Sequence, residues 1–377
     1  MMAQRTPRTR LVVSGLAVAM AALLAACSST SKTASSGSES PAGSAAASAS
    51  SAAASSPASG GSSTGGGSYV IGVSNTIAGN GWREEMICSI KAQALVSGQV
   101  KKVVVISKNG GPTDQIQDLQ NLISQGVNAI IVNPSDPEKL NSVLEAAVKK
   151  GIVVVAVDQA VTAPDVYLAA NNQEEYGKLG AEWLAKALNG KGDVLYMRGA
   201  QGAPADIARD QGFRSVMAQY PGIKFKEVYT GWDFTKAAAL ATQELTAHHY
   251  DGIWTSGTDY TVVNAFKTLG KTPIPVVGAD NNGFVAQLLA GQPGAAVTNP
   301  AAVGAVGLDI ALDVLQGKSV PKQTLLTPEV WDLATAKDKL QTYHFPNLPP
   351  TWPSQVEIKP WTTYTPQQLI ACKGPGE

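Results

Sequence analysis

From residue 69 onward, short apolar runs alternate with longer stretches in which apolar residues recur every three or four positions. The runs 102–106 and 129–132 are almost continuously apolar, as expected of strands that are buried on both faces of a parallel sheet. Between them, Ile116, Leu119 and Ile123 keep helical spacing. The pattern predicts a β–α–β unit, whose crossover should be right-handed.

The alternation continues to about residue 170 and then starts again after a helix predicted at 175–188. Consecutive β–α units of this kind favour an α/β fold, here two similar doubly wound parallel-sheet lobes. Other predicted helices lie at 84–96, 208–219, 236–246 and 301–315, and one begins at Asp136-Pro137. The predicted strands are one that starts at Tyr69, then 102–106, 129–132, 152–157, 166–169, 193–197, 223–229, 252–255, 275–279 and 295–298.

The N-terminus has the pattern of an export signal. Three arginines precede the apolar run 11–26, which is shorter than the roughly 20 residues of a membrane span. The sequence Leu24-Ala25-Ala26-Cys27 resembles the lipobox of bacterial lipoproteins, which implies cleavage after residue 26 and a lipid on Cys27. An ordinary signal peptide and an N-terminal anchor helix are the alternatives.

Residues 27–68 are almost entirely Ser, Ala, Gly and Thr, so the segment has little apolar surface to bury and predicts a disordered tether. Within it, the stretch 61–65 matches the G-x-S-x-G pattern of serine hydrolases. The match is discarded, because no strand precedes it and no helix follows it.

Composition argues against some classes of function. The formal net charge is zero and no basic stripe is present, so nucleic acid is not expected as a partner. The chain has three cysteines and three histidines, without a C-x-x-C pair, so neither a metal site nor a cofactor is expected. Cys88 and Cys372 have two interpretations, a disulfide permitted by export or two separate buried thiols.

Polar and aromatic residues gather where the predicted strands end. In an open α/β sheet, ligands bind at the carboxyl ends of the strands, so these loops should converge if the halves face each other. Arg, Asp and Asn side chains suit vicinal hydroxyls, and their charges roughly cancel, which favours a neutral polar ligand. The strand-end segments are Asn80-Gly81-Trp82-Arg83, Asp158-Gln159, Gly231-Trp232-Asp233, Gly257-Thr258-Asp259, Ala279-Asp280-Asn281-Asn282 and Thr298-Asn299-Pro300, with Arg209 near a helix start.

Six segments resemble the periplasmic sugar-binding proteins of the ribose/galactose type. They are Gly79-Asn80-Gly81-Trp82-Arg83, Asn133-Pro134-Ser135-Asp136, Val157-Asp158-Gln159, Arg209-Asp210-Gln211-Gly212-Phe213, Trp254-Thr255-Ser256-Gly257-Thr258-Asp259 and Val276-Val277-Gly278-Ala279-Asp280. The resemblance covers 69 to about 333. It implies a type I fold with a three-stranded hinge, capture of a sugar or polyol, and delivery to an ABC permease. It also implies a monomer held at the outer face of the cell membrane. The expected divisions are the signal 1–26, the tether 27–68, an N-terminal lobe of 69–170 plus 301–325, a C-terminal lobe of 171–300 plus 326–340, and a surface-wrapping tail 341–377.

The family motif carries a ligand-binding role to a set of strand-end residues. Three positions depart from it: Gln159 stands where an arginine is common, Thr258 where an asparagine is common, and Ala279 where an aromatic sometimes occurs. The departures bear on which sugar is bound. The expected ligand-binding residues are Asn80, Trp82, Arg83, Asp158, Gln159, Arg209, Trp232, Thr258, Asp280 and Thr298.

Three other functions are compatible with parts of the sequence. A glycosidase using Asp158 and Asp280 would place its carboxylate pair on two lobes of a flexible cleft, a poor arrangement for fixed acid–base catalysis. A receptor for a sensor kinase or chemoreceptor would look the same in sequence. A repressor with this architecture would need an N-terminal helix-turn-helix, and residues 1–68 have the composition of a signal and a tether.

Overall fold

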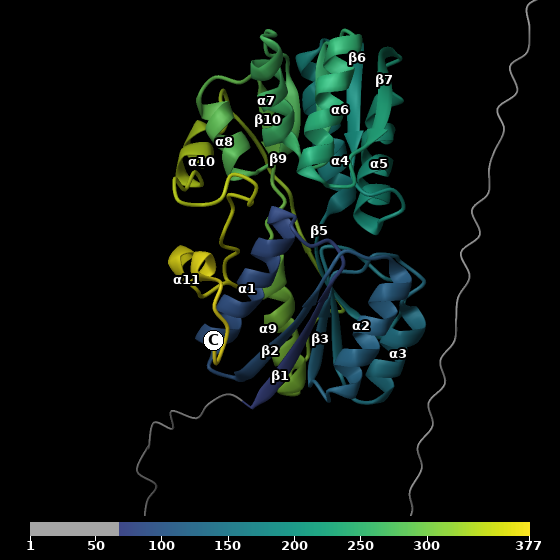
Figure 1. The fold of residues 1–377 in the computed structure, drawn as a ribbon, viewed down its shortest axis with the longest axis vertical. Coiled ribbons are helices and arrows are strands. Elements are labelled where there is room, and N and C mark those ends of the chain that lie inside the picture. The colour runs from purple at the N-terminus through teal and green to yellow at the C-terminus, as the bar shows by residue number, and fades with distance from the viewer. Residues whose placement is uncertain (1–67) are drawn as a thin grey trace, which may run out of the picture. The chain divides into compact units, whose positions relative to one another are not determined.

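The computed structural model describes residues 68–377, which contain two six-stranded sheets (Figure 1). The expected signal peptide, Cys27 and the tether up to residue 67 lie outside the described residues. The first sheet is parallel throughout, in the order β11-β5-β4-β3-β1-β2. Its strands are β1 (Tyr69–Asn75), β2 (Val100–Ser107), β3 (Ala129–Val132), β4 (Val153–Val157), β5 (Tyr167–Asn171) and β11 (Gln323–Leu326).

The second sheet repeats this order as β12-β10-β9-β8-β6-β7, with β12 alone running antiparallel to its neighbour. The prediction of an α/β fold made of two similar, mainly parallel lobes is therefore confirmed. The strands of the second sheet are β6 (Lys191–Arg198), β7 (Gly222–Tyr229), β8 (Gly252–Thr255), β9 (Val276–Ala279), β10 (Gly294–Val297) and β12 (Val330–Asp332).

Helices cover both faces of each sheet, and each lobe has its own buried clusters on the two sides of its strands. The N-terminal lobe carries α1 (Gly81–Ser97), α2 (Pro112–Ser124), α3 (Asn141–Lys149), α9 (Val303–Leu315) and α11 (Pro366–Ala371). The C-terminal lobe carries α4 (Gln173–Ala187), α5 (Pro204–Met217), α6 (Phe234–Ala247), α7 (Asp259–Leu269), α8 (Asn282–Leu289) and α10 (Lys337–Thr342).

One predicted helix start is wrong. The Asp136-Pro137 signal predicted the first turn of a helix, but α3 begins only at Asn141. The Asp136 side chain instead accepts hydrogen bonds from the main-chain N–H groups of Glu138 and Lys139. Because the carboxylate forms this Asx-type turn, it does not cap a helix, and the helix begins five residues after Asp136.

The chain passes between the lobes three times before it reaches the C-terminal segment. The first passage leads from β5 into α4, the second from β10 into α9, and the third from β11 into β12. The lobe boundaries expected from the sequence, after residues 170, 300 and 325, lie close to these three passages. The loops at the carboxyl ends of the parallel strands therefore lie toward the region between the two sheets.

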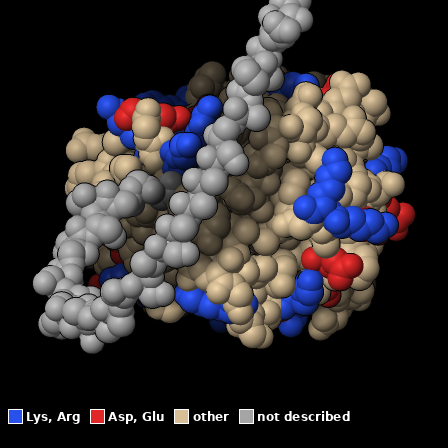
Figure 2. Space-filling model, turned by 90° about the horizontal axis from the view of Figure 1, so that it is seen from below, with Lys and Arg blue, Asp and Glu red and all other residues tan. Residues whose placement is uncertain are grey.

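On the lower face of the molecule, Lys and Arg side chains are scattered around the surface and interspersed with Asp and Glu (Figure 2). No helix within residues 68–377 combines the length and the apolar character needed to cross a bilayer.

Candidate functional site

A cavity lies between the lobes, at the carboxyl ends of the strands. Both lobes contribute, and the lining combines two indoles with amide, guanidinium, carboxylate and hydroxyl groups. The lining residues are Asn80, Trp82, Arg83, Asp158, Arg209, Trp232, Ser256, Gly257, Ala279, Asn281 and Asn299.

The first turn of α1 places three of these residues. Asn80 is the N-cap of the helix, and its side-chain oxygen accepts from the Arg83 N–H at 3.1 Å. The buried Arg83 side chain then donates to Asn75 Oδ1 at the end of β1, at 3.1 Å. The Trp82 indole N–H donates across to the Asn299 carbonyl at 2.6 Å. Capping thus fixes the turn, and the turn aims its side chains into the cavity.

Asp158 follows β4 and adopts a left-handed backbone with φ 65°. A non-glycine residue in this region is uncommon and is enriched at functional sites. The carboxylate is 5% exposed and accepts a hydrogen bond of 2.6 Å from Gln173 Nε2, at the start of α4. Gln173 in turn accepts from Arg209 Nε at 2.8 Å. A chain of polar side chains thus links Asp158 on the N-terminal lobe to α5 on the C-terminal lobe.

Trp232 forms the opposite wall of the cavity, and its backbone is also in the left-handed region, with φ 58°. Its indole lies directly against Gly199, where a Cβ atom would overlap the ring. The indole N–H donates to Ser256 Oγ at 3.2 Å, and the same hydroxyl accepts from Arg209 at 3.0 Å. The Trp232 carbonyl accepts from Asn80 Nδ2 at 2.9 Å, so the two lobes touch each other across the cavity mouth.

Burial dominates the electrostatics of the cavity. It lowers the pKa of Arg83 to about 10, while Asp158 opposes the change and Arg209 adds to it. Burial likewise raises the pKa of Asp158, against the pull of Arg83 and Arg209. The charged residues that line the cavity are therefore two guanidiniums and one carboxylate. The lining itself therefore has one guanidinium in excess, because the second carboxylate expected there, that of Asp280, lies behind it.

Four residues expected to bind ligand lie outside this lining. Gln159 accepts from the main chain of Ala205 at 3.1 Å and lines an outer groove that adjoins the cavity. Thr258 is fully buried, with no partner for its hydroxyl among the described residues. Thr298 accepts from the Glu329 N–H at 2.9 Å, within the hinge.

Asp280 is the fourth. Its Oδ1 accepts from the Asn299 N–H at 2.8 Å, and its Oδ2 accepts from the Gln355 N–H at 3.2 Å. The side chain is fully buried, and burial raises its pKa to about 6. Both carboxylate oxygens are thus held by the main chain of the protein itself.

The residues that sequence reasoning missed are the immediate neighbours of those it chose. Asn281 replaces Asp280 in the lining, Asn299 replaces Thr298, and Ser256 with Gly257 replaces Thr258. With its amide oxygen turned toward the cavity, Asn299 accepts from Arg209 at 3.1 Å and from the Trp82 indole at 3.0 Å. The strand-end segments therefore locate the cavity lining to within one or two residues.

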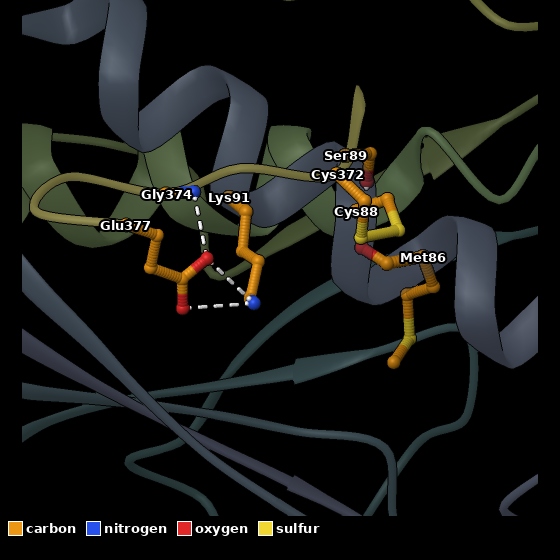
Figure 3. The surroundings of a disulfide bond; sticks show 7 residues. All are labelled: Met86, Cys88, Ser89, Lys91, Cys372, Gly374 and Glu377. Atoms are coloured by element: carbon orange, nitrogen blue, oxygen red, sulfur yellow. Dashed lines mark hydrogen bonds and ion pairs between the residues drawn. A yellow bond between two sulfur atoms is a disulfide. The ribbon is translucent and has the colours of Figure 1, made fainter. Parts of the chain in front are cut away.

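Among residues 68–377, no cluster of three or more His, Cys, Asp or Glu side chains has the geometry of a metal site. The two remaining cysteines are joined, Cys88 in α1 to Cys372 just after α11 (Figure 3).

Comparison with known proteins agrees with this architecture. Residues 71–319 match the family model described as a periplasmic binding protein domain. A xylitol-binding protein of Mycolicibacterium smegmatis is 30% identical over 57% of this chain, and the match spans 64% of that relative's length. The ribose import binding protein of Bacillus subtilis is 26% identical over 67% of this chain and 84% of its own.

Solved structures of solute-binding proteins also superpose on this chain. An ABC transporter solute-binding protein from Thermobispora bispora superposes with a TM-score of 0.70 at 27% identity, covering 76% of this chain and 90% of that one. The arabinose-binding component from Shewanella sp. ANA-3 superposes with a TM-score of 0.67 at 25% identity, covering 72% and 95%. Family membership implies an extracytoplasmic location, and the resemblance deduced from the strand-end motifs is confirmed. The chain belongs to the periplasmic binding protein domain family.

Proposed function

We propose that this chain is the substrate-binding component of an ABC importer, which captures a sugar or polyol between its two lobes. The observation that carries the proposal is the cavity at the strand ends, built from both lobes and lined by two indoles facing polar side chains. Indole faces cover the C–H faces of a sugar ring, while amide, guanidinium and carboxylate groups bond its hydroxyls. The matched relatives, a xylitol-binding and a ribose import protein, support this ligand class.

Binding requires the lobes to open and close about the three passages. Interlobe contacts such as Asn80 to Trp232 and Gln159 to Ala205 belong to the closed arrangement. A ligand that touches both lobes shifts the equilibrium toward closure by its differential affinity for that state. The closed form would then be recognised by a membrane permease. No bond of the sugar is made or broken, which distinguishes this role from that of a glycosidase.

The exported location suits a receptor that is fixed to the membrane. We extend the proposal to a lipid on Cys27 and a tether up to residue 68, which would hold a monomeric binding domain near its permease. The lipobox-like sequence before Cys27 and the composition of the following segment support this extension. Mass spectrometry of the mature protein from membranes would show a diacylglycerol on Cys27, or its absence.

A thermal-shift screen tests the ligand class. The purified protein is mixed with pentoses, hexoses, furanosides, polyols, sugar acids, nucleosides and amino acids. A ligand at 100 times its dissociation constant adds about 2.7 kcal/mol of stability, which is a clear shift. Sugar acids are included because the cavity lining has two guanidiniums and one carboxylate.

Trp82→Ala should abolish the shift, because it removes an aromatic wall of the cavity. Trp183→Ala is the matched control, since Trp183 lies on α4 and its indole N–H donates to Asp332 at the end of β12, away from the cavity. A response to nucleosides or amino acids alone would overturn the ligand class. Consumption of a glycoside would instead indicate an enzyme.

A further inference from the structure

The C-terminal segment, residues 343–377, returns from the C-terminal lobe to the N-terminal lobe (Figure 1). We call it the strap. It begins after α10, which packs on α8 and β12, and it ends with α11 against α1. The strap is therefore a fourth passage between the lobes, in addition to the three of the hinge.

On the C-terminal lobe, the strap binds the segment that contributes Asn281 to the cavity. Asn282 donates through its side chain to the carbonyls of Phe345 at 2.8 Å and Leu348 at 2.9 Å. The main chain of Asn281 bridges to Pro353. Two strap N–H groups bond Asp280, that of Ser354 to its carbonyl at 2.7 Å and that of Gln355 to its carboxylate at 3.2 Å.

On the N-terminal lobe, the strap supports the turn that carries Asn80, Trp82 and Arg83. The Gly81 backbone lies against Thr351 so closely that a Cβ atom would come within 2.6 Å of the Thr351 carbonyl oxygen. The strap also buries apolar side chains on α1. They form a cluster with Cys88 and Ala92 whose strap members are Leu348, Trp352, Val356, Tyr364 and Leu369.

The far end of the strap is covalently fixed. Cys372 is bonded to Cys88 in the middle of α1, and the Glu377 carboxylate pairs with Lys91 one turn further along, at 2.8 Å (Figure 3). The Thr363 N–H donates to Gln93 Oε1 at 3.0 Å on the same helix. The strap thus contacts a cavity-forming segment on each lobe and is anchored at its end by a disulfide.

We propose that the strap, fastened by the Cys88–Cys372 disulfide, limits opening of the lobes and positions the ligand-binding segments at Asn80–Arg83 and Asp280–Asn282. Asp280 is then a positioning residue: its carboxylate holds the Asn299 and Gln355 N–H groups and does not face the ligand. The part of this inference that concerns ligand affinity rests on the proposed function. The part that concerns opening does not.

The experiment compares the wild type with Cys88→Ser/Cys372→Ser. Small-angle X-ray scattering without ligand measures the radius of gyration, and titration with the sugar found in the screen gives the Kd and the dissociation rate. The variant without the disulfide should have a larger radius of gyration than the wild type. Its Kd should rise about tenfold as the fraction of binding-competent, closed molecules falls. Lys91→Ala removes only the ion pair at the same end and should leave both values unchanged.

A lower melting temperature with unchanged Kd and radius of gyration would overturn the proposal, since the strap would then be only a structural support. Gly81→Ala keeps the disulfide and pushes Thr351 away from α1, so it tests the same idea if the serine variant does not fold. It should weaken binding, while Gly374→Ala, whose Cβ would sit 3.5 Å from Lys91 without overlap, should not. Equal Kd values for these two variants would also overturn the proposal.

Failure of the proposed function would be separately visible. If no sugar stabilises the wild type, the ligand class is wrong. The scattering comparison without ligand still decides whether the strap limits opening.

Discussion

Two aspartates stand at corresponding places in the two sheets, and the protein uses them differently. Asp158 follows β4 and Asp280 follows β9, each the third strand from the same side of its sheet. Asp158 lines the cavity and bonds a side chain, Gln173. Asp280 is turned away, and its carboxylate holds two main-chain N–H groups. Equivalent positions in the fold therefore do not guarantee equivalent roles: the strap supplies a hydrogen-bond donor to the Asp280 carboxylate, whereas the Asp158 carboxylate bonds Gln173.

The largest expected effect is on stability at Asp280. Asp280→Ala leaves two main-chain N–H groups without acceptors, that of Asn299 buried and that of Gln355 partly buried, and each such group costs up to about 1–3 kcal/mol. We expect the free energy of unfolding to fall by about 3 kcal/mol, measured by urea denaturation. Asp158→Ala, which strands no main-chain donor, should lose much less. Equal losses for the two variants would contradict the comparison.

The next effect is on binding at Asp158. Asp158→Ala removes a charged acceptor from the cavity, so ligand affinity should fall by about 2 kcal/mol, roughly 30-fold. Isothermal titration with the sugar from the screen measures it. Asp165→Ala, an exposed aspartate of the same lobe, is the matched control and should bind as the wild type does. An unchanged Kd for Asp158→Ala would remove Asp158 from the proposed site.

The pH dependence sharpens the same contrast. Burial raises the pKa of Asp280 from 3.8 to about 6, so the folded protein holds a proton that the unfolded chain has already lost. Stability from this group is therefore full below about pH 4 and declines as pH rises toward 6, by about 1.4 kcal/mol per pH unit at most. Asp280→Asn does not titrate and should lack this decline. Parallel stability curves for the two proteins between pH 4 and 7 would refute the assignment.

The smallest effect concerns Thr258, which the family motif predicts at the ligand. Its hydroxyl is buried and has no acceptor or donor among the described residues. Thr258→Val keeps the shape and removes the unpaired hydroxyl, so binding should change by less than about 0.5 kcal/mol, within the range of neutral substitutions. Calorimetry on this variant and on the wild type makes the check. A large loss of binding affinity would indicate that Thr258 contacts the ligand.

The sequence predicts the fold well because its signals are local. Continuous apolar runs such as Ala129–Val132 indicate strands buried on both faces. Apolar residues at helical spacing indicate the helices that cover these strands. The same signals fail at Asp136, where a side chain that resembles a helix cap forms its own turn five residues early.

The strand-end pattern leads to the loops that line the cavity but not always to the residue that lines it. Asn80, Trp82 and Arg83 line the cavity because a cap and a helix turn fix their directions. At the ends of β9 and β10, side-chain direction depends on partners distant in sequence: Gln355 for Asp280 and Glu329 for Thr298. Such partners come from the strap and the hinge, whose sequences have little periodicity, so strand-end position alone could not choose between neighbours.

The disulfide also sets an order of events during biosynthesis. Cys88 and Cys372 are 284 residues apart, and every strand from β2 to β12 lies between them. The bond can form only after residue 372 has been made and has reached an oxidising compartment. Closure of this covalent ring is therefore a late step, and a chain that stops short of residue 372 carries an unpaired thiol at Cys88. A molecule with the Cys88–Cys372 disulfide is therefore one in which both lobes have been synthesised.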